Sequence, residues 1–395
     1  LWLANGLAMI PRLGGQVKVA HELGAQAPER AAGYGQAAFH LGALLVILFT
    51  AMCILLNGPL IAFFKLNSPQ VNSDARVYLV IVALGFLFSF FNQIFTGLFT
   101  AMGSSVVVLR STAVGLVGNI LLDPLMIFGV GPFPRMEVAG AAAATVLAQA
   151  IVTAMFLLAA RRETTLFPHI HPFRPSQGRA WLEMLRIGLP VSIQSMFFSS
   201  LSMFIARIVA GWGDAAIAAQ KVGTQIESIS YTTAEGFATA VNAFIAQNFG
   251  ARKEERIRKG VKSALITTVL FSLVISILVF LFAKPLMLIF VRPHETEILN
   301  IGISYLRIEG AFYCGIGILF LLYGYYRAIR MPGMSVVLTV VSLGTRVALS
   351  YWLAGIPAIG VIGIWWSIPI GWFIADVIGI IYYKYRKSSQ TIEFK

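Results

Sequence analysis

Charged residues are scarce in this chain, and their scarcity indicates its class. They make up 12% of the 395 residues, whereas 58% of the residues are hydrophobic. The mean hydropathy is +0.80. A soluble domain has about a quarter charged residues. A chain with so little charge and so many apolar runs is predicted to be a polytopic membrane protein.

Cysteine and the common catalytic motifs are also lacking. Cys53 and Cys314 lie in separate apolar runs, so they predict neither a disulfide framework nor a zinc site. The sequence has no GxxxxGK[ST] phosphate loop, no HExxH pair and no paired aspartates. These absences argue against coupling to a nucleotide and leave a membrane-embedded enzyme with little support. We therefore expect no enzyme activity and no cofactor.

Long apolar runs are what the sequence does have. About eleven of them approach the 20 residues that cross a bilayer as a helix. They predict an all-α membrane protein, although Ala215–Ala246 is longer and more polar than a plain span. The runs are Leu1–Ala20, Gly35–Leu56, Val77–Phe99, Val107–Gly129, Val138–Ala160, Met184–Ala210, Ala215–Ala246, Ser263–Ala283, Gly302–Tyr326, Met334–Ala354 and Gly360–Tyr383.

Positive charges gather in alternate connections between these runs. Arginine and lysine crowd residues 161–186 and 252–262 and the C-terminal end, whereas the opposite connections hold only Lys65, Arg76, Arg135, Lys284 and Arg292. Since basic loops stay on the cytoplasmic side, the C-terminus is predicted to be cytoplasmic, in the plasma (inner) membrane. The net charge of +13 then reflects orientation and not nucleic-acid binding. An odd number of spans would put Leu1 outside, which predicts a further span before it.

An internal repeat divides the chain. HELGAQAPER around Gly24 resembles QNFGARKEER around Gly250, and VAG at residues 138–140 corresponds to VIG at 361–363. The repeat predicts two pseudo-symmetric six-helix bundles, the first of which lacks its first helix. Paired bundles around a midplane site are a transporter layout. The expected parts are an N-lobe at 1–160 (spans 2–6), a cytoplasmic linker at 161–182, a C-lobe at 183–387 (spans 7–12) and a cytoplasmic tail at 388–395.

Asn119 and Asp123 are polar residues inside the apolar run Leu116–Gly131. Four residues apart on a helix, they share one face, and Pro124 leaves the carbonyl of Ile120 without its helical partner. Polar groups at membrane depth are costly and are usually functional. The pair therefore indicates a proton or cation site, with Asp123 and Asn119 as ligands if the ion is Na⁺. The alternative is a hydrogen-bonded pair that joins two helices.

A second polar group is expected in the C-lobe. Glu227, Tyr231 and Glu235 recur at four-residue steps along one helix face, while Glu309 and Arg346 lie in later spans. They form either structural ion pairs, such as Glu309 with Arg346, or a cation or substrate site. The candidates for this C-lobe site are Gln194, Glu227, Glu235, Glu309 and Arg346. Tyr231 is a candidate for lining a cavity, as are Asn92 and Gln93 in the N-lobe.

Five segments resemble the multidrug and toxic compound extrusion (MATE) family, and they follow the family order over almost the whole chain. They are GGQVKVAHELGA (Gly14–Ala25), GNILLDPLMIFG (Gly118–Gly129), EVAGAAAATVLAQ (Glu137–Gln149), GLPVSIQS (Gly188–Ser195), and AIAAQKVGTQIE through FIAQNFGA (Ala216–Ala251). The resemblance implies twelve spans in two lobes. It also implies export of organic cations or amphipathic drugs in exchange for Na⁺ or H⁺.

The resemblance also assigns candidate roles. Asn119 and Asp123 match the fifth-span Asn and Asp of the family's N-lobe cation site, whose other acid belongs to the first span. In the C-lobe this chain departs from the members that have a seventh-span acid, because it offers Gln194 and Ser199 there. Glu235 and Glu309 are candidates to replace that acid.

Together these features predict a secondary-active multidrug exporter that works by alternating access and acts as a monomer in the lipid bilayer. Its partners would be small cationic or amphipathic solutes and not nucleic acid. Two alternatives stay open: a lipid-linked oligosaccharide flippase of the same superfamily, for which Arg207, Lys221 and Arg346 would line a cationic cavity, and a membrane-embedded enzyme or scaffold. Drug susceptibility of an expressing cell distinguishes an exporter from these alternatives.

Overall fold

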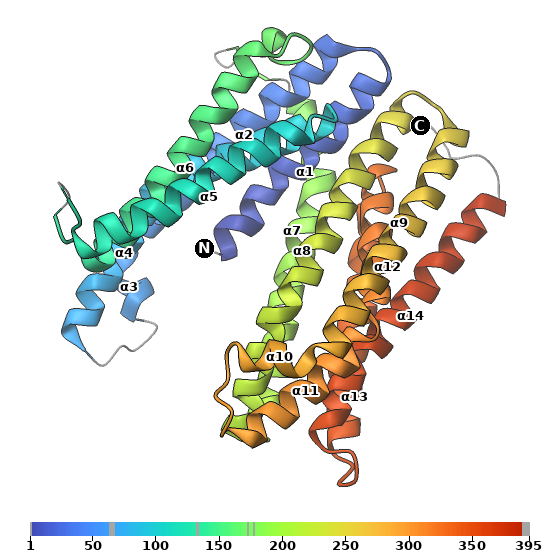
Figure 1. The fold of residues 1–395 in the computed structure, drawn as a ribbon. Helices are drawn as coiled ribbons and strands as arrows, with labels where there is room; N and C mark the ends of the chain where they lie inside the picture. The colour runs from blue at the N-terminus through green and yellow to red at the C-terminus, as the bar shows by residue number, and fades with distance from the viewer. Residues whose placement is uncertain (1, 63–67, 132–133, 172–173, 177, 389–395) are drawn as a thin grey trace. The chain divides into compact units, whose positions relative to one another are not determined.

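The fold is helical throughout the part of the chain that the structure describes, a computed structural model of residues 2–62, 68–131, 134–171, 174–176 and 178–388. These residues form fourteen α-helices and one short 3-10 helix, and no strand is found among them (Figure 1). The predicted all-α membrane fold is confirmed. The helices group into two compact units, Leu1–Ser192 and Ile193–Lys395.

The core of the first unit lies where four helices meet. Small and aromatic residues such as Ala8, Val46, Phe86 and Ala142 form a cluster from α1, α2, α4 and α6. A second cluster stacks Phe95 and Phe99 of α4 on Phe156 of α6. The elements of this unit are α1 (Trp2–Gly24), α2 (Pro28–Leu55), α3 (Asn57–Ala62), α4 (Pro69–Ala101), α5 (Ser105–Phe128), α6 (Glu137–Arg162), η1 (Phe167–His169) and the beginning of α7 (Gly178–Ala210).

Glycines bring α5 and α6 into close contact. A Cβ atom on Gly140 would lie 2.4 Å from the carbonyl oxygen of Met126, and one on Gly115 would lie 2.1 Å from the Val152 side chain. Small residues of this kind let helices approach where no hydrophobic force drives them together in lipid. The motif EVAGAAAA at the beginning of α6 therefore sets the position of α5, which carries Asn119 and Asp123.

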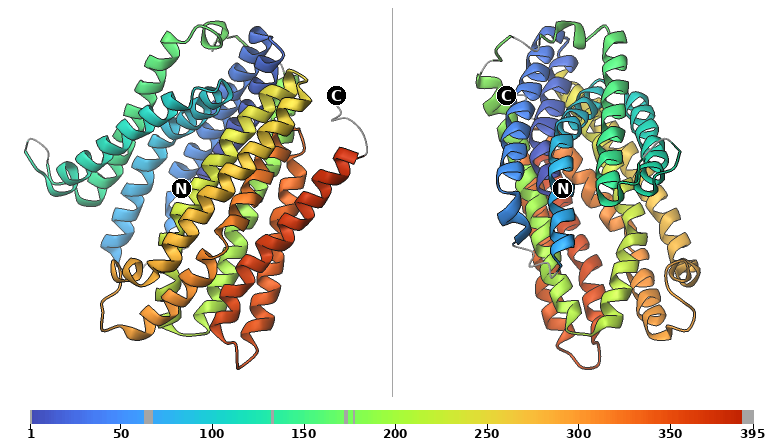
Figure 2. Two further views of the ribbon diagram at one scale, coloured as in Figure 1. Left: turned by 45° about the vertical axis from the view of Figure 1, so that its right-hand side comes forward. Right: turned by 90° about the vertical axis from the view of Figure 1, so that its left-hand side faces the viewer.

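The second unit is built around α8 and α12, which pack closely because a Cβ atom on Gly324 would lie 2.4 Å from the Ala238 carbonyl oxygen. The helices α13 and α14 run side by side (Figure 2). Besides the end of α7, the unit holds α8 (Asp214–Gly250), α9 (Glu254–Leu281), α10 (Ala283–Leu288), α11 (Thr296–Gly310), α12 (Tyr313–Ala328), α13 (Pro332–Ala354) and α14 (Val361–Ser388).

Eight of the described helices are long and apolar enough to cross a membrane, or nine if the bent pair α11–α12 counts as one span. Two further long helices, α1 and α8, are not among them: α1 carries Arg12 and Lys18, and α8 carries a polar stripe. The predicted span Gly302–Tyr326 corresponds to the bent pair α11–α12. The chain bends by 51° between these helices, directly after Gly310, where a Cβ atom would lie 2.9 Å from Val279.

The predicted linker at 161–182 contains η1 and the first turn of α7, and the first compact unit continues along α7 to Ser192. The predicted lobe boundaries stay predictions. Lys65 and the predicted tail after Ser388 lie outside the described residues.

Candidate functional site

Asn119 and Asp123 meet on α5 as their spacing predicts. The Asn119 side-chain amide donates a hydrogen bond to Asp123 Oδ1 at 3.3 Å, and both side chains are half-buried. Pro124 lies inside the helix without ending it. The pair therefore offers a carboxylate and an amide oxygen on one helix face, which are ligands suited to a proton or a hard cation.

The amides of Asn92 and Gln93 join helices in the first unit. Asn92 donates to the backbone and side-chain oxygens of Gln149, both at 2.9 Å, and its own oxygen accepts from Thr153 at 2.8 Å. Gln93 accepts a bond of 2.7 Å from Arg12. Asn92 is 6% exposed. These contacts are typical of interhelical polar packing, and a role in lining a cavity stays a prediction.

Two buried glutamates lie together in the second unit. Glu227 of α8 accepts a 2.7 Å hydrogen bond from the hydroxyl of Tyr305 on α11. Glu309, which is fully buried at the end of α11, lies next to Glu227 and within its electrostatic reach. Neither oxygen of Glu309 accepts a hydrogen bond from a donor among the described residues. Two adjacent carboxyl groups in a dry site repel each other unless a proton or a cation lies between them.

Arg346 of α13 does not neutralise this pair by direct contact. It is half-buried and lies within electrostatic reach of Glu309, but no ion pair within 4.0 Å links it to either glutamate among the described residues. The arginine therefore sets the local potential without occupying the carboxyl oxygens. The pair keeps free ligand positions for a small cation.

Gln194 and Glu235 lie apart from the glutamate pair. Gln194 donates to Thr339 at 2.6 Å and accepts from Arg327 and Ser335, so it belongs to a separate buried network. Glu235 is exposed on α8. Of the predicted C-lobe candidates, the structure brings together Glu227, Glu309 and Arg346 and not the other two.

Tyr231, one turn after Glu227 on α8, lies in an aromatic group. Its ring makes edge-on contacts with Phe198, Phe320 and Trp372, at centroid distances of 6.4, 6.0 and 6.3 Å. Tyr231 itself is partly exposed. Aromatic faces next to carboxylates are surroundings that suit an organic cation.

Three further buried polar residues were not among the site candidates predicted from the sequence. Tyr305 lies one helical turn before Glu309, and that spacing could have linked it to the pair. Asp376 of α14 is 6% exposed, and its Oδ1 atom has no hydrogen-bond partner within the described part of the chain. The sequence signal for Asp376 was a single acid inside an apolar run, which is typical of a functional residue in a membrane protein. Tyr313, the first residue of α12, is fully buried near both glutamates.

A different acid, Glu183 of α7, is paired in the first unit. It forms an ion pair with the buried Lys18 of α1, accepts a 2.6 Å hydrogen bond from Tyr34, and lies 3.2 Å from Arg179. The Lys18 ammonium also lies 4.8 Å from the centre of the Tyr34 ring. Sequence reasoning did not find this contact, because the two helices are far apart in the chain.

Two units of long apolar helices with carboxylates buried among them define a polytopic membrane protein with the architecture of a transporter. The chain belongs to the MATE family, whose model, described as MatE, matches residues 6–125 and 190–352. The resemblance seen in the sequence motifs is thereby confirmed.

Individual relatives agree with this assignment. The chain is 26% identical over 380 residues to the probable multidrug resistance protein NorM of Thermotoga maritima, covering 95% of this chain and 80% of that protein. It is 28% identical over 320 residues to the probable multidrug resistance protein YpnP of Bacillus subtilis, covering 79% and 68%. A solved multidrug resistance MATE family transporter in an outward-facing conformation shares the fold, with a TM-score of 0.87 at 21% identity over 98% of this chain and 85% of that one.

Proposed function

We propose that this protein is a secondary-active multidrug exporter that exchanges organic cations or amphipathic drugs for Na⁺ or H⁺. The names of its relatives, probable multidrug resistance proteins, support the substrate class. The observation that carries the coupling mechanism is the Glu227–Glu309 pair, which is buried and has no direct ion-pair partner among the described residues.

The chemistry of the pair fits an exchange. A proton or a small cation relieves the repulsion between the two carboxyl groups, and a cationic drug nearby competes for the same negative charge. Binding of one therefore favours release of the other, which is the differential affinity that alternating access requires. Asn119 and Asp123 offer a second place in the first unit for the same exchange, with Na⁺ or H⁺ as the transported ion.

The bend between α11 and α12 supports a role for Glu309. The glutamate lies at the end of α11, directly before the break. Interrupted helices in transporters supply free backbone groups at ion sites and absorb conformational change. A proton arriving at Glu309 would act where the helix is least continuous.

We further propose that the protein lies in the plasma (inner) membrane as a monomer with a cytoplasmic C-terminus. The asymmetry of lysine and arginine between alternate loops supports this orientation. The acids in both units disfavour a phosphate-bearing substrate, since like charges repel.

Dye efflux tests the proposal. Cells that express the protein should export ethidium, and Asp123→Asn and Glu309→Gln should each lower the initial efflux rate about tenfold at equal protein level, because each removes a charge that the ion must neutralise. Glu235→Gln, which changes an exposed acid on the same helix as Glu227, is the matched control. Efflux that is unchanged in both site variants would refute carboxylate coupling.

A further inference from the structure

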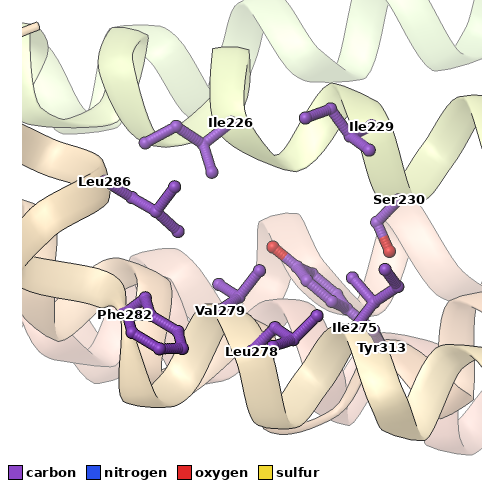
Figure 3. A pocket seen from close by; sticks show the side chains of 9 residues that line it. All are labelled: Ile226, Ile229, Ser230, Ile275, Leu278, Val279, Phe282, Leu286 and Tyr313. Atoms are coloured by element: carbon purple, nitrogen blue, oxygen red, sulfur yellow. The ribbon is translucent and has the colours of Figure 1, made fainter. Parts of the chain in front are cut away.

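A cavity of about 260 Å³ opens in the second unit, and neither glutamate of the buried pair is among the residues that line it (Figure 3). Its walls come from α8, α9, α10 and the first residue of α12, and no charged residue lines it. The volume is below the range of drug-sized sites, so it suits one alkyl chain or one ring.

The cavity is lined in part by exposed apolar side chains, which we expect to face lipid. Ile229 of α8, Leu278 of α9 and Phe282 at the end of α9 line it and are 65%, 46% and 51% exposed. Helix α9 has the most apolar window of the candidate spans, with a mean hydropathy of 2.8, and only 17% of that window is buried. A solute dissolved in the bilayer can therefore reach the cavity without crossing water.

One polar group without a partner lies inside. The ring of Tyr313 forms the inner wall, and its hydroxyl points into the space between Ile226 and Val279 (Figure 3). Tyr313 is fully buried, and its hydroxyl has no hydrogen-bond partner in the part of the chain described. A buried donor without an acceptor destabilises a protein, so a ligand that accepts this hydrogen would be bound favourably here.

We propose that this cavity binds a small uncharged amphipathic solute from the bilayer, with its apolar body against α8 and α9 and an oxygen or uncharged nitrogen accepting the hydrogen of the Tyr313 hydroxyl. A lipid acyl chain would leave this hydroxyl unpaired, and an organic cation would find no carboxylate on the walls. The inference rests on the proposed export function and adds a substrate class and a route from the membrane.

The position of Tyr313 links the cavity to the coupling site. The residue follows the break between α11 and α12 and interacts electrostatically with Glu227 and Glu309. Val279, on the cavity wall, packs against Gly310 at the same break. A solute that holds Tyr313 and Val279 in place would therefore restrict movement of the segment that carries Glu309.

Photolabelling tests the proposal on the full-length protein in lipid nanodiscs. The probe is azioctanol, a photoreactive medium-chain alcohol, and the matched probe is a diazirine alkane of the same length. Azioctanol should label α8 and α9 residues of the cavity saturably. Tyr313→Phe should weaken its binding about fivefold, the equivalent of one hydrogen bond, and leave the alkane unaffected. Tyr351→Phe, at an exposed tyrosine on α13, is the control.

A second pair of variants keeps the test independent of folding. Ser230→Leu should fill the cavity and abolish saturable labelling, whereas Ser228→Leu makes the same change on the exposed face of α8 and should leave it intact. Equal loss of alcohol and alkane in Tyr313→Phe would overturn the proposal, as would labelling by a photoreactive phospholipid that the alcohol cannot displace. Labelling should persist in Glu309→Gln, so failure here is distinct from failure of the coupling mechanism.

Discussion

Glu183 in the first unit and the Glu227–Glu309 pair in the second show two ways of placing acids among membrane helices. Glu183 is held by the Lys18 ammonium, the Tyr34 hydroxyl and Arg179. Glu227 receives one hydroxyl hydrogen bond, and Glu309 receives none among the described residues. The negative charge of Glu183 is therefore balanced by cations in contact with it. No cation among the described residues is in contact with the Glu227–Glu309 pair.

This difference in contacting partners distinguishes an acid with a structural role from acids with a functional role. A buried ion pair with all partners present stabilises one packing of its helices and loses that stabilisation when one partner is removed. An acid cluster without a contacting cation has to take up a proton or an ion from outside, so its charge varies with the conditions. We therefore propose that Glu183 stabilises the fold and that the Glu227–Glu309 pair acts in the transport cycle.

Removing Lys18 should have the largest effect on stability. Lys18→Met leaves Glu183 with only the exposed Arg179 as a cation, and we expect the free energy of unfolding to fall by about 3 kcal/mol. Thermal unfolding of the detergent-solubilised protein measures this loss. The second change Glu183→Gln should recover most of it, and Lys262→Met at an exposed lysine is the control. Equal stability of Lys18→Met and Lys262→Met would contradict a structural role.

Removing the hydroxyl of Tyr305 should have a smaller effect, and on transport. Tyr305→Phe keeps the ring contact with Trp365, whose centroid lies 4.8 Å away, and removes the hydrogen bond from the Tyr305 hydroxyl to Glu227. We expect a fall of about fivefold in efflux rate per molecule and a changed dependence of the rate on the driving ion.

Tyr326→Phe is the matched control for this change. Its hydroxyl donates to the Gly379 carbonyl at 2.7 Å and not to a carboxylate. This variant should lose about 1 kcal/mol of stability and keep its efflux rate per molecule. If the two variants impair efflux equally, the tyrosine next to Glu227 has no special role.

Glu163, in the connection between α6 and η1, accepts hydrogen bonds from backbone N–H groups. Its replacement should have the smallest effect on stability. Partial burial raises the pKa of its carboxyl, but hydrogen bonds from the N–H groups of Phe167, Leu166 and Thr165 outweigh this and lower it. A folded-state pKa below the unfolded value of about 4.3 adds stability at neutral pH that is lost as the pH falls through the folded value.

The variant Glu163→Gln isolates this contribution. It should cost about 1 kcal/mol at neutral pH, and the difference from the natural protein should vanish in acid, as unfolding measured at several pH values would reveal. Glu235→Gln at an exposed acid should not show this pH dependence. A difference between Glu163→Gln and the natural protein that persists in acid would mean that the carboxylate charge is not its source.

Local spacing in the sequence predicted contacts along one helix well. The four-residue interval between Asn119 and Asp123 predicted that their side chains meet. The apolar runs predicted the long helices, and the sequence motifs indicated the family. Periodicity does not say which helices meet, so the contact of Glu183 with Lys18 had no signal in the chain. The spacing of Tyr305 and Glu309 indicates that they share one face of α11, but it does not indicate that Tyr305 contacts Glu227. The 51° bend between α11 and α12 was not predicted either. A Cβ atom on Gly310, directly before the bend, would lie 2.9 Å from Val279 of another helix, and a contact of that kind leaves no periodic pattern in the sequence.

The measurement that tests the central claim most directly is the displacement of cations when a drug binds to the purified protein. Release of protons, followed with a pH indicator in weak buffer, and release of ²²Na⁺ can both be counted per bound ethidium. We predict that the natural protein releases one of these ions and that the double variant Glu227→Gln, Glu309→Gln releases measurably less, while Glu235→Gln behaves like the natural protein. The same release from the double variant would contradict the assignment of this pair to coupling.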